Sequence, residues 1–268
     1  MKTTRFVLSA VALASAAFAQ TSFAEESLAY NVGAISEYRY RGLGQTKGNP
    51  ALQGGVDYDS GKGFYVGAWA STIKWIKEIG NDSTTYSAKT GSSLADVKGP
   101  IELDIYGGYK FEAAGVNYDV GYLRYEYVGN TLDKVNGYKN ANTDEVYGAV
   151  TYGPFTAKYS YAFSNLFGVD DGAGKNSKGS TYLDLSATFD LGSGYTLVPH
   201  IGRQEVKNYG GLSYTDYALT LNKDLGKGLS ASLAAIGTNV TGDKKNNFTT
   251  NGYVTTKDTL VVGLKYTF

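Results

Sequence analysis

Apolar and polar residues alternate along most of the chain after about residue 27. The clearest example is the segment 259–268, whose apolar positions are Leu260, Val262, Leu264, Tyr266 and Phe268. A period of two over about ten residues is the length and pattern of a membrane-spanning β-strand, which turns apolar side chains to lipid and polar ones to the lumen. Taken alone, the segment also suits an ordinary amphipathic strand. Its terminal aromatic residue resembles the sorting signal that the outer-membrane barrel assembly machinery recognises.

The same alternation predicts about twelve strands of about ten residues each. They are expected near 28–40, 51–59, 64–71, 101–110, 116–122, 145–152, 155–164, 182–191, 195–205, 216–222, 229–235 and 259–268. The connections between them are short and long in turn, and the segment 74–99 is expected to be an exposed loop. We therefore predict an all-β fold, a transmembrane antiparallel up-and-down β-barrel with short turns at one end and long loops at the other. A soluble β-sandwich does not account for this rhythm.

Two predicted strands carry irregular features. Pro199 cannot donate a hydrogen bond to a neighbouring strand, so a bulge or another irregularity is expected in segment 195–205. Arg124 and Glu126 share the apolar face of their strand, and a basic residue at the membrane midplane costs about 2–4 kcal/mol. We therefore expect both beyond the membrane edge, with Tyr125 and Tyr127 at the interface.

The first 24 residues have the features of a secretory signal peptide. Lys2 and Arg5 precede an apolar stretch at 6–19, and small residues follow at two sites, ending at Ala19 and Ala24. This arrangement predicts export and cleavage after one of these two alanines. With cleavage after Ala24, residues 25–268 are a single barrel domain, which we expect in the bacterial outer membrane.

Composition agrees with this interpretation. The mean hydropathy is −0.26 and no later run approaches the about 18 apolar residues of a spanning helix. The chain has 24 tyrosines and 35 glycines, residues typical of interfacial belts and of turns. It has no cysteine, which excludes disulfides and thiolate metal sites. Lys and Arg total 25 and so do Asp and Glu, so no nucleic-acid partner is indicated.

Three segments near the start, 36–46, 49–58 and 63–71, resemble the TorF family of porin-like proteobacterial proteins, long catalogued without a known function. The matching positions are Ser36, Tyr38, Arg41, Gly42, Gln45, Thr46, Pro50, Ala51, Gln53, Gly54, Asp57, Tyr58, Gly63, Phe64, Tyr65, Gly67, Trp69 and Ser71. Gly44 and Val128 depart from the family pattern, in loop or strand-end positions. The resemblance implies an outer-membrane barrel. Its porin role is itself an inference from fold.

The polar positions of the predicted strands are the residues expected to line a pore. They are Glu37, Arg39, Arg41, Asp57, Trp69, Glu102, Asp104, Lys110, Asp119, Glu145, Lys158, Asp184, His200, Asp216 and Lys265. Acidic residues exceed basic ones, so a weak preference for cations is expected. The alternative is that these charges pair with one another and fill the barrel. Twelve strands lie between side-chain-filled barrels of eight and open porins of sixteen or more.

Arg39 and Arg41 begin the first long connection. They could bind an anionic solute or a lipopolysaccharide phosphate, or brace the loop as a constriction. The simpler alternative is that they pair with acids such as Asp57 or Glu102 on neighbouring strands.

Candidate chemistry is otherwise sparse. No nucleotide loop, zinc signature or nucleophile elbow is present, and we expect no cofactor. His200 is the only histidine, and a hydrolase built around it lacks a motif for its nucleophile. Asp170 and Asp171 suit solvated loop charge better than a cation site.

We therefore expect a non-enzymatic porin for small hydrophilic solutes, in contact with outer-membrane lipid and lipopolysaccharide. A non-conducting structural barrel is the alternative.

Overall fold

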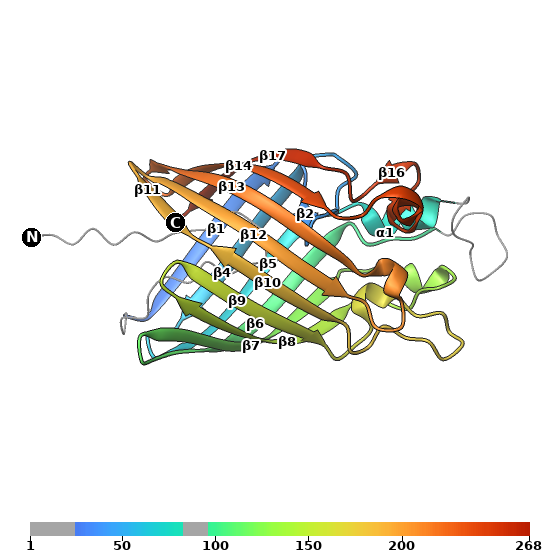
Figure 1. Cartoon of the computed structure of the whole chain (residues 1–268), viewed down its shortest axis with the longest axis horizontal. Coiled ribbons are helices and arrows are strands. Elements are labelled where there is room, and N and C mark those ends of the chain that lie inside the picture. The colour runs from blue at the N-terminus through green and yellow to red at the C-terminus, as the bar shows by residue number, and fades with distance from the viewer. Residues whose placement is uncertain (1–24, 83–95) are drawn as a thin grey trace, which may run out of the picture.

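The computed structural model describes residues 25–82 and 96–268, which form a closed antiparallel β-barrel (Figure 1). Its wall consists of β1 (Ser27–Ile35), β4 (Ala51–Asp59), β5 (Phe64–Thr72), β6 (Ile101–Ala113), β7 (Val116–Tyr127), β8 (Thr143–Tyr152), β9 (Phe155–Ala162), β10 (Thr181–Ala187) with β11 (Phe189–Gly192), β12 (Tyr195–Glu205), β13 (Tyr214–Gly226), β14 (Leu229–Thr238) and β17 (Thr259–Thr267). Because β10 and β11 are one wall strand interrupted at Thr188, the barrel has 12 strands. The predicted fold class is confirmed.

The interruption lies beside Pro199, because the register places Ala187 opposite this proline and Thr188 opposite Val198. Residues Tyr195 to Gln204 of β12 pair with β13 without a register shift, so the irregularity expected here lies on the side of β10 and β11, which also has a register shift between Asp190 and Gly192. On its other side β12 pairs His200 with Ser186 of β10 and Leu197 with Phe189 of β11. A proline nitrogen cannot donate to a ladder, and the neighbouring strand breaks at that position instead.

The last strand closes the barrel on the first. β17 pairs with β1 from Asn31–Thr267 to Ile35–Gly263, and with β14 on its other side. Phe268 extends the seam, because its N–H donates to the carbonyl of Tyr30 and its carbonyl accepts from the Tyr30 N–H, each at 2.9 Å. The predicted pairing of the two terminal segments is confirmed, and the closed sheet has no free edge.

The apolar side chains of the alternating pattern form the outer surface of the barrel. Leu260 is 71% exposed, Leu52 is 67% exposed, and similar residues follow on every wall strand. Their polar neighbours along the strands point inward and are mostly buried. An exposed apolar surface of this extent is a site for contact with lipid or another apolar partner.

Glycine and tyrosine are paired on the inner wall. A side chain on Gly67 would lie 2.5 Å from the Tyr106 ring, so this ring lies flat against the neighbouring strand. The same close approach joins Tyr65 to Gly108, Tyr147 to Gly121 and Tyr182 to Gly202. Part of the high tyrosine and glycine content therefore belongs to the interior rather than to interfacial belts and turns.

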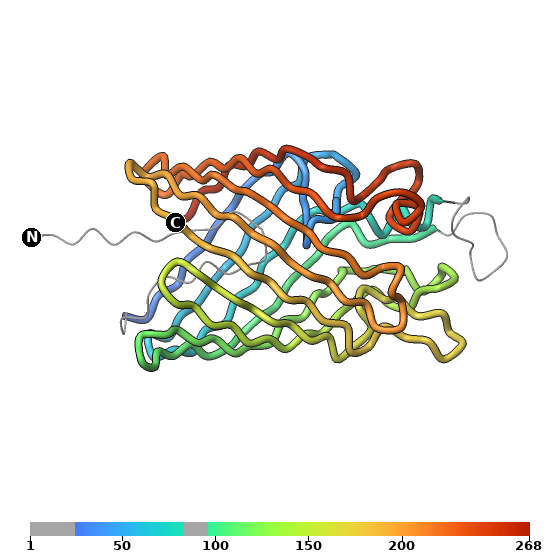
Figure 2. The backbone as a smooth tube through the Cα atoms, viewed as in Figure 1, coloured from blue at the N-terminus to red at the C-terminus, as the bar shows by residue number. Residues whose placement is uncertain are grey.

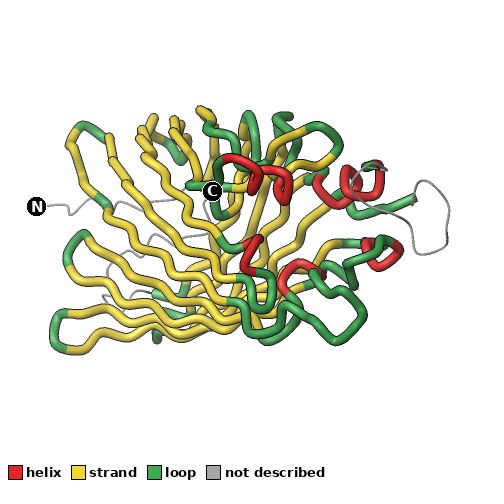
Figure 3. The backbone as a smooth tube through the Cα atoms, turned by 45° about the vertical axis from the view of Figure 1, so that its right-hand side comes forward, coloured by secondary structure: helices red, strands yellow, loops and turns green. Residues whose placement is uncertain are grey.

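Short turns join the strands at one end of the barrel, which we call the turn end. Ala114 and Gly115, with φ values of 53° and 74°, make one of them. Two successive left-handed residues match the right-handed twist of a hairpin. The opposite loop end carries the long connections (Figures 2 and 3). The predicted alternation of short and long connections is observed.

The loop-end connections contain short elements. They are the hairpin of β2 (Arg39–Tyr40) and β3 (Leu43–Gly44), the helix α1 (Trp75–Asn81), the 3-10 turns η1 (Leu132–Lys134), η2 (Leu166–Gly168), η3 (Gly210–Leu212) and η4 (Gly242–Phe248), and the hairpin of β15 (Thr249–Thr250) and β16 (Tyr253–Val254). No helix in the described part of the chain is long and apolar enough to cross a membrane.

Three expectations about this end are wrong. The first strand ends at Ile35, not near Tyr40. The segment expected as an exposed loop includes α1, whose Ile76 and Ile79 are buried. Tyr125 and Tyr127 are buried inside the barrel, at 1% and 2% exposure, rather than at its outer interface. The alternating pattern is the same for an inward and an interfacial tyrosine, so it cannot separate the two. The predicted signal peptide, 1–24, lies outside the described residues.

Candidate functional site: the barrel interior and its inserted loop

The connection from β1 to β4, residues 36–50, folds into the barrel and is called the inserted loop below. The N–H of Val262 donates to the Ser36 hydroxyl at 3.0 Å, and the chain then leaves the wall. Arg41 and Gly42 form the tip of the β2–β3 hairpin with φ values of 46° and 78°. A side chain on Gly42 would lie 2.6 Å from the Asp216 Cβ, so the tip contacts the wall at β13.

Arg41 ties the tip to two more wall strands. Its guanidinium binds both carboxylate oxygens of Glu145 on β8, at 2.7 and 3.0 Å. It also donates to the Gln204 side-chain oxygen on β12 at 2.8 Å. The Tyr182 ring lies 4.2 Å from the guanidinium carbon. A loop that starts at β1 therefore crosses the interior and is held on the far wall by a bidentate ion pair, the strongest geometry for arginine.

Arg39 holds the base of the inserted loop. Its Nη1 donates to the carbonyls of Thr255 and Lys257 at 2.8 and 3.0 Å, and its Nη2 pairs with Glu37 at 3.1 Å. The Tyr253 hydroxyl donates to the same glutamate. The two arginines do pair with acids, as the simpler alternative expected, but the partners are Glu37 and Glu145 rather than Asp57 or Glu102. The physical reason is that the loop leaves the wall after Ser36 and crosses to β8.

Glu37, Arg39 and Arg41 thus belong to the inserted loop and not to a wall strand. The physical reason is that residues 39–44 form a separate hairpin. Its side chains alternate with the same period as those of β1, so the sequence pattern does not show where β1 ends. The other twelve residues expected to line a pore lie on the inward face of the wall strands. Whether they line a conducting pore stays a prediction.

Tyrosine hydroxyls donate to most of the inward carboxylates. Tyr38 binds Glu102 at 2.6 Å, Tyr65 binds Asp119 at 2.7 Å, and Tyr106 binds Asp57. Such hydrogen bonds compensate a buried carboxylate for part of the water it loses. Sequence alternation places these residues on one face, but it does not show which hydroxyl reaches which acid.

His200 lies between two carboxylates. Its Nε2 is 2.8 Å from Asp216 and its Nδ1 is 3.3 Å from Asp184. The Tyr182 hydroxyl lies 3.2 Å from Nε2. These contacts join β10, β12 and β13. Ser186 is paired in register with His200, but no serine or threonine hydroxyl among the described residues forms a hydrogen bond with the ring. The arrangement suits a crosslink of the wall better than a nucleophile and base.

The interior toward the turn end is more open. Asp57 is exposed although it lies on the inward face, and Lys110, Lys158 and Lys265 are half-buried. The Lys110 ammonium lies 4.4 Å from the Tyr65 ring and the Lys158 ammonium 3.8 Å from the Tyr147 ring. Charged side chains on the inward face are therefore accessible to water near the turn end of the barrel.

An apolar cluster fills the interior around the inserted loop. It includes Ile76 and Leu132, both 0% exposed, with Tyr125 and Tyr127. Trp75 packs edge-on against Tyr127, with ring centroids 5.3 Å apart. Sequence reasoning missed this cluster. The signal for it was the apolar spacing of Ile76 and Ile79 within a segment otherwise rich in polar residues.

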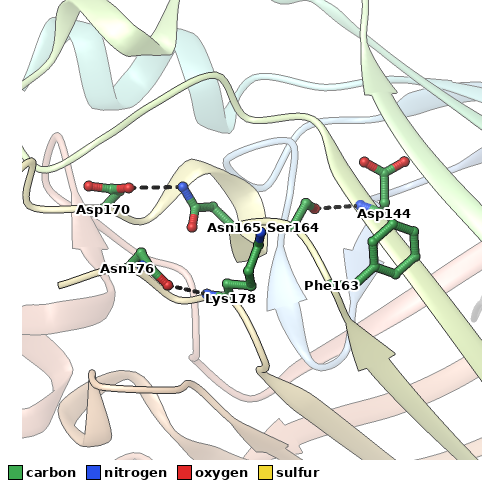
Figure 4. Close-up of a pocket in the computed structure, with 7 residues that line it drawn as sticks. All are labelled: Asp144, Phe163, Ser164, Asn165, Asp170, Asn176 and Lys178. Atoms are coloured by element: carbon green, nitrogen blue, oxygen red, sulfur yellow. Dashed lines mark hydrogen bonds between the residues drawn. The ribbon is translucent and has the colours of Figure 1, made fainter. Parts of the chain in front are cut away.

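A surface hollow of about 510 Å³ lies at the loop end beside β8 and β9 (Figure 4). Asn165 donates to Asp170 at 3.0 Å, and the Asp144 N–H donates to Ser164 at 2.7 Å. Asp171 accepts from the N–H groups of Ala173 and Lys175 at 2.8 and 3.0 Å. The two loop aspartates thus organise their own turn. Among the described residues no group of His, Asp or Glu is arranged to hold a metal ion.

These features define the class of protein: a closed 12-stranded barrel, with an apolar outside and a polar inside, whose loop end is filled by an inserted loop. The chain belongs to a family of bacterial proteins of unknown function, Gcw_chp, whose model matches residues 19–268. No curated protein sequence matches it. The TorF resemblance stays a prediction.

Solved porins share the fold. The KdgM porin in complex with disordered oligogalacturonate aligns with a TM-score of 0.50 and 9% identity over 90% of this chain and 98% of that one. The NanC porin aligns with a TM-score of 0.49 and 11% identity over 90% and 99%. At such low identity the likeness to KdgM supports the barrel fold and nothing about the solute.

Proposed function

We propose that this protein is a bacterial outer-membrane channel for small hydrophilic solutes, and that the inserted loop makes it narrow. The observation that carries the proposal is the polar interior below the loop, where Asp57 is exposed inside a closed barrel. Water-accessible charged residues on the inside of an apolar-coated barrel are a feature of porin-type channels.

The distribution of charge supports a preference for cations. Arg41 is neutralised by Glu145 and Arg39 by Glu37, so neither loop arginine adds net positive charge. The remaining inward acids are Asp57, Glu102, Asp104, Asp119, Asp184 and Asp216. They face Lys110, Lys158, Lys265 and His200. An excess of fixed negative charge attracts cations into a narrow lumen.

Planar-bilayer recording of the purified protein tests the proposal. We expect small conductance steps from the parent protein. We expect larger ones from a variant in which residues 37–49 are replaced by a short Gly/Ser linker. In a salt gradient, the reversal potential should favour cations. If neither protein gives conductance steps, the channel proposal is wrong. Anion selectivity would contradict the proposed charge distribution.

The outer-membrane location is part of the same proposal. The apolar outer surface suits lipid. At its loop-end edge Arg124 pairs with Asp144 and Glu126, at 3.0 and 2.7 Å, on the outward face, where lipopolysaccharide headgroups would lie. We propose the C-terminal strand, with Leu260, Val262, Leu264, Tyr266 and Phe268, as the signal for the barrel assembly machinery.

A non-conducting structural barrel is the second candidate. The apolar cluster around Ile76 and Leu132 favours it, because a packed core inside a barrel blocks water. The same recordings separate the two, since a structural barrel stays silent until its loop is removed. We propose no catalytic role, because the contacts of His200 are carboxylates and a phenol.

A further inference from the structure

Among the described inward carboxylates, Asp104 is the one with no hydrogen bond or ion pair at either oxygen, whereas Asp119 and Asp184 have one unbonded oxygen each and a partner at the other. Asp104 on β6 is 5% exposed, and its Oδ1 makes no hydrogen bond within residues 25–82 and 96–268. No lysine, arginine or histidine in those ranges forms an ion pair with it. A buried carboxylate without a compensating group is costly, so this position favours a positive charge from outside the chain.

The charges around Asp104 strengthen its preference for a positive charge from outside the chain. Glu102 and Glu145 are the charged neighbours of Asp104. Arg41 neutralises Glu145, whereas the donors to Glu102 are two neutral hydroxyls, those of Tyr38, at 2.6 Å, and Tyr127. Two buried acids therefore share a region of the wall with no basic side chain in ion-pair contact with either among the described residues.

Aromatic rings flank this position. Asp104 is paired in register with Trp69 on β5 and with Tyr125 on β7, so all three lie side by side on the inward face. The Tyr38 ring meets the Trp69 ring edge-on at 5.5 Å. Indole and phenol rings attract ammonium groups through their faces, most strongly where water is excluded. A divalent metal ion instead requires a shell of six or more oxygen ligands.

A polar path leads to the position from the open turn end. Asp57, Gly67 and Tyr106 are paired in register across β4, β5 and β6. Asp57 is exposed and accepts the Tyr106 hydroxyl, and Tyr106 is two residues from Asp104 on the same face of β6. The Tyr106 ring lies over Gly67 and also packs against the buried apolar cluster that includes Tyr125.

We propose that Asp104, flanked by Trp69 and Tyr125, is a binding site for a small organic cation, an amine or quaternary ammonium compound, and that such cations are the solutes of the channel. The assignment of solute rests on the proposed function. The site itself does not require conduction. The cation would reach Asp104 from the turn end past Asp57 and would supply the charge that this carboxylate lacks.

Tryptophan fluorescence tests the site directly. The chain has two tryptophans, Trp69 and Trp75. In the Trp75→Phe variant only Trp69 reports, and the Trp75 indole nitrogen has no hydrogen-bond partner to lose among the described residues. The variant is titrated with choline in detergent micelles, and with sodium chloride at equal ionic strength. We expect a saturable change with choline and not with sodium.

The matched variants carry Asp104→Asn or Asp144→Asn in the same background. Asp104→Asn should weaken choline binding about tenfold or more, because it removes the charge and keeps the shape. Asp144→Asn removes a carboxylate on the outer face and should leave binding unchanged. Equal binding by the Asp104→Asn protein, or no saturable response of Trp69, would overturn the site.

Folding and conduction are measured separately. Asp104→Asn removes an uncompensated charge, so heat-modified gel mobility should show a folded barrel. Bilayer recordings with choline chloride then test transport. If choline binds but no conductance is seen, the binding-site proposal stands and the channel proposal is wrong. If conductance is seen but choline does not bind, the channel proposal stands and the binding-site proposal is wrong.

Discussion

Arg41 shows how much one side chain contributes to the interior of this barrel. It brings a buried positive charge to Glu145 and joins a loop that starts at β1 to strands β8 and β12. The net attraction of a buried ion pair contributes little to folding stability, because both charges lose their water. Removal of Arg41 is costly instead because it leaves Glu145 buried with no counter-charge.

Arg41→Ala should therefore destabilise the folded protein by about 3–5 kcal/mol. Urea titration in detergent micelles or liposomes measures the change. Arg203→Ala is the matched control, because Arg203 pairs with Glu205 at 2.6 Å on the surface, with side chains 43% and 55% exposed. An exposed pair contributes at most about 1 kcal/mol. Equal effects of the two substitutions would show that the Arg41 pair is not the anchor described above.

The glycine–tyrosine contacts make a second prediction. All three atoms nearest to a side chain on Gly67 belong to Tyr106, so Gly67→Ala should cost about 1–3 kcal/mol by overpacking. In the Tyr106→Ala background the same substitution should cost much less, a coupling that a double-mutant cycle measures. Gly148→Ala on β8, where a side chain meets nothing within 4 Å, is the control. Additive effects would contradict the flat-ring contact.

At the scale of elements, α1 holds the inserted loop in place. The N–H groups of Lys74 and Trp75 donate to the Gln45 carbonyl at 2.8 and 3.1 Å. Glu78 on α1 binds Lys47 at 2.6 Å and Asn251 at 2.7 Å. Partial burial acts to raise the pKa of Glu78, but the hydrogen bonds from Lys47 and Asn251 outweigh it and hold this pKa below its usual value.

This shift predicts a dependence on pH. A carboxyl whose pKa is lower in the docked state than in the free state stabilises docking above the free value, about 4.3, and the contribution is lost as the pH falls through the lowered pKa. Amide exchange at Lys74 and Trp75, corrected for its intrinsic rate, should therefore accelerate below about pH 4. Glu78→Gln should show fast exchange already at neutral pH, whereas Glu112→Gln, exposed near the turn end, should not. Exchange that is independent of pH in the parent would contradict this role.

The sequence predicted wall elements well and inserted elements poorly, and the reason is physical. Ile101, Leu103 and Ile105 alternate with Glu102 and Asp104 because the two faces of β6 meet different surroundings, which is a local property. Side chains of the β2–β3 hairpin also alternate, but the position of the hairpin inside the barrel depends on contacts with Glu145 and Gln204, which are far away in the sequence. Local alternation carries no information about such partners.

At the scale of the whole molecule, the seam between β1 and β17 decides whether the sheet is a barrel. Phe268 completes this seam with two backbone hydrogen bonds, and its ring stacks on Tyr30 at 5.8 Å. The ring is 65% exposed on the outer surface, so it adds little packing within the fold.

Phe268→Ala keeps both backbone hydrogen bonds and removes the ring. We expect a clear loss of assembled protein in the outer membrane but a change in the stability of refolded barrels of less than about 1.5 kcal/mol. Fractionation of cell envelopes and urea titration measure the two. Phe155→Ala, which removes another exposed aromatic ring near the turn end, should accumulate normally. Full accumulation of the Phe268→Ala protein would remove the proposed assembly signal.

The inserted loop also has a consequence for the order of assembly. Its anchors are separated from it by 104 residues at Glu145, 163 at Gln204 and 216 at Thr255. Contacts of such high sequence separation form late, because the chain between them must be ordered first. Strands can pair with their neighbours before Arg41 has a pocket to enter. The seam between β1 and β17 joins residues that are still further apart, such as Asn31 and Thr267. For the same reason neighbouring strands pair first, the inserted loop reaches its anchors next, and the barrel closes around a loop that is already in place.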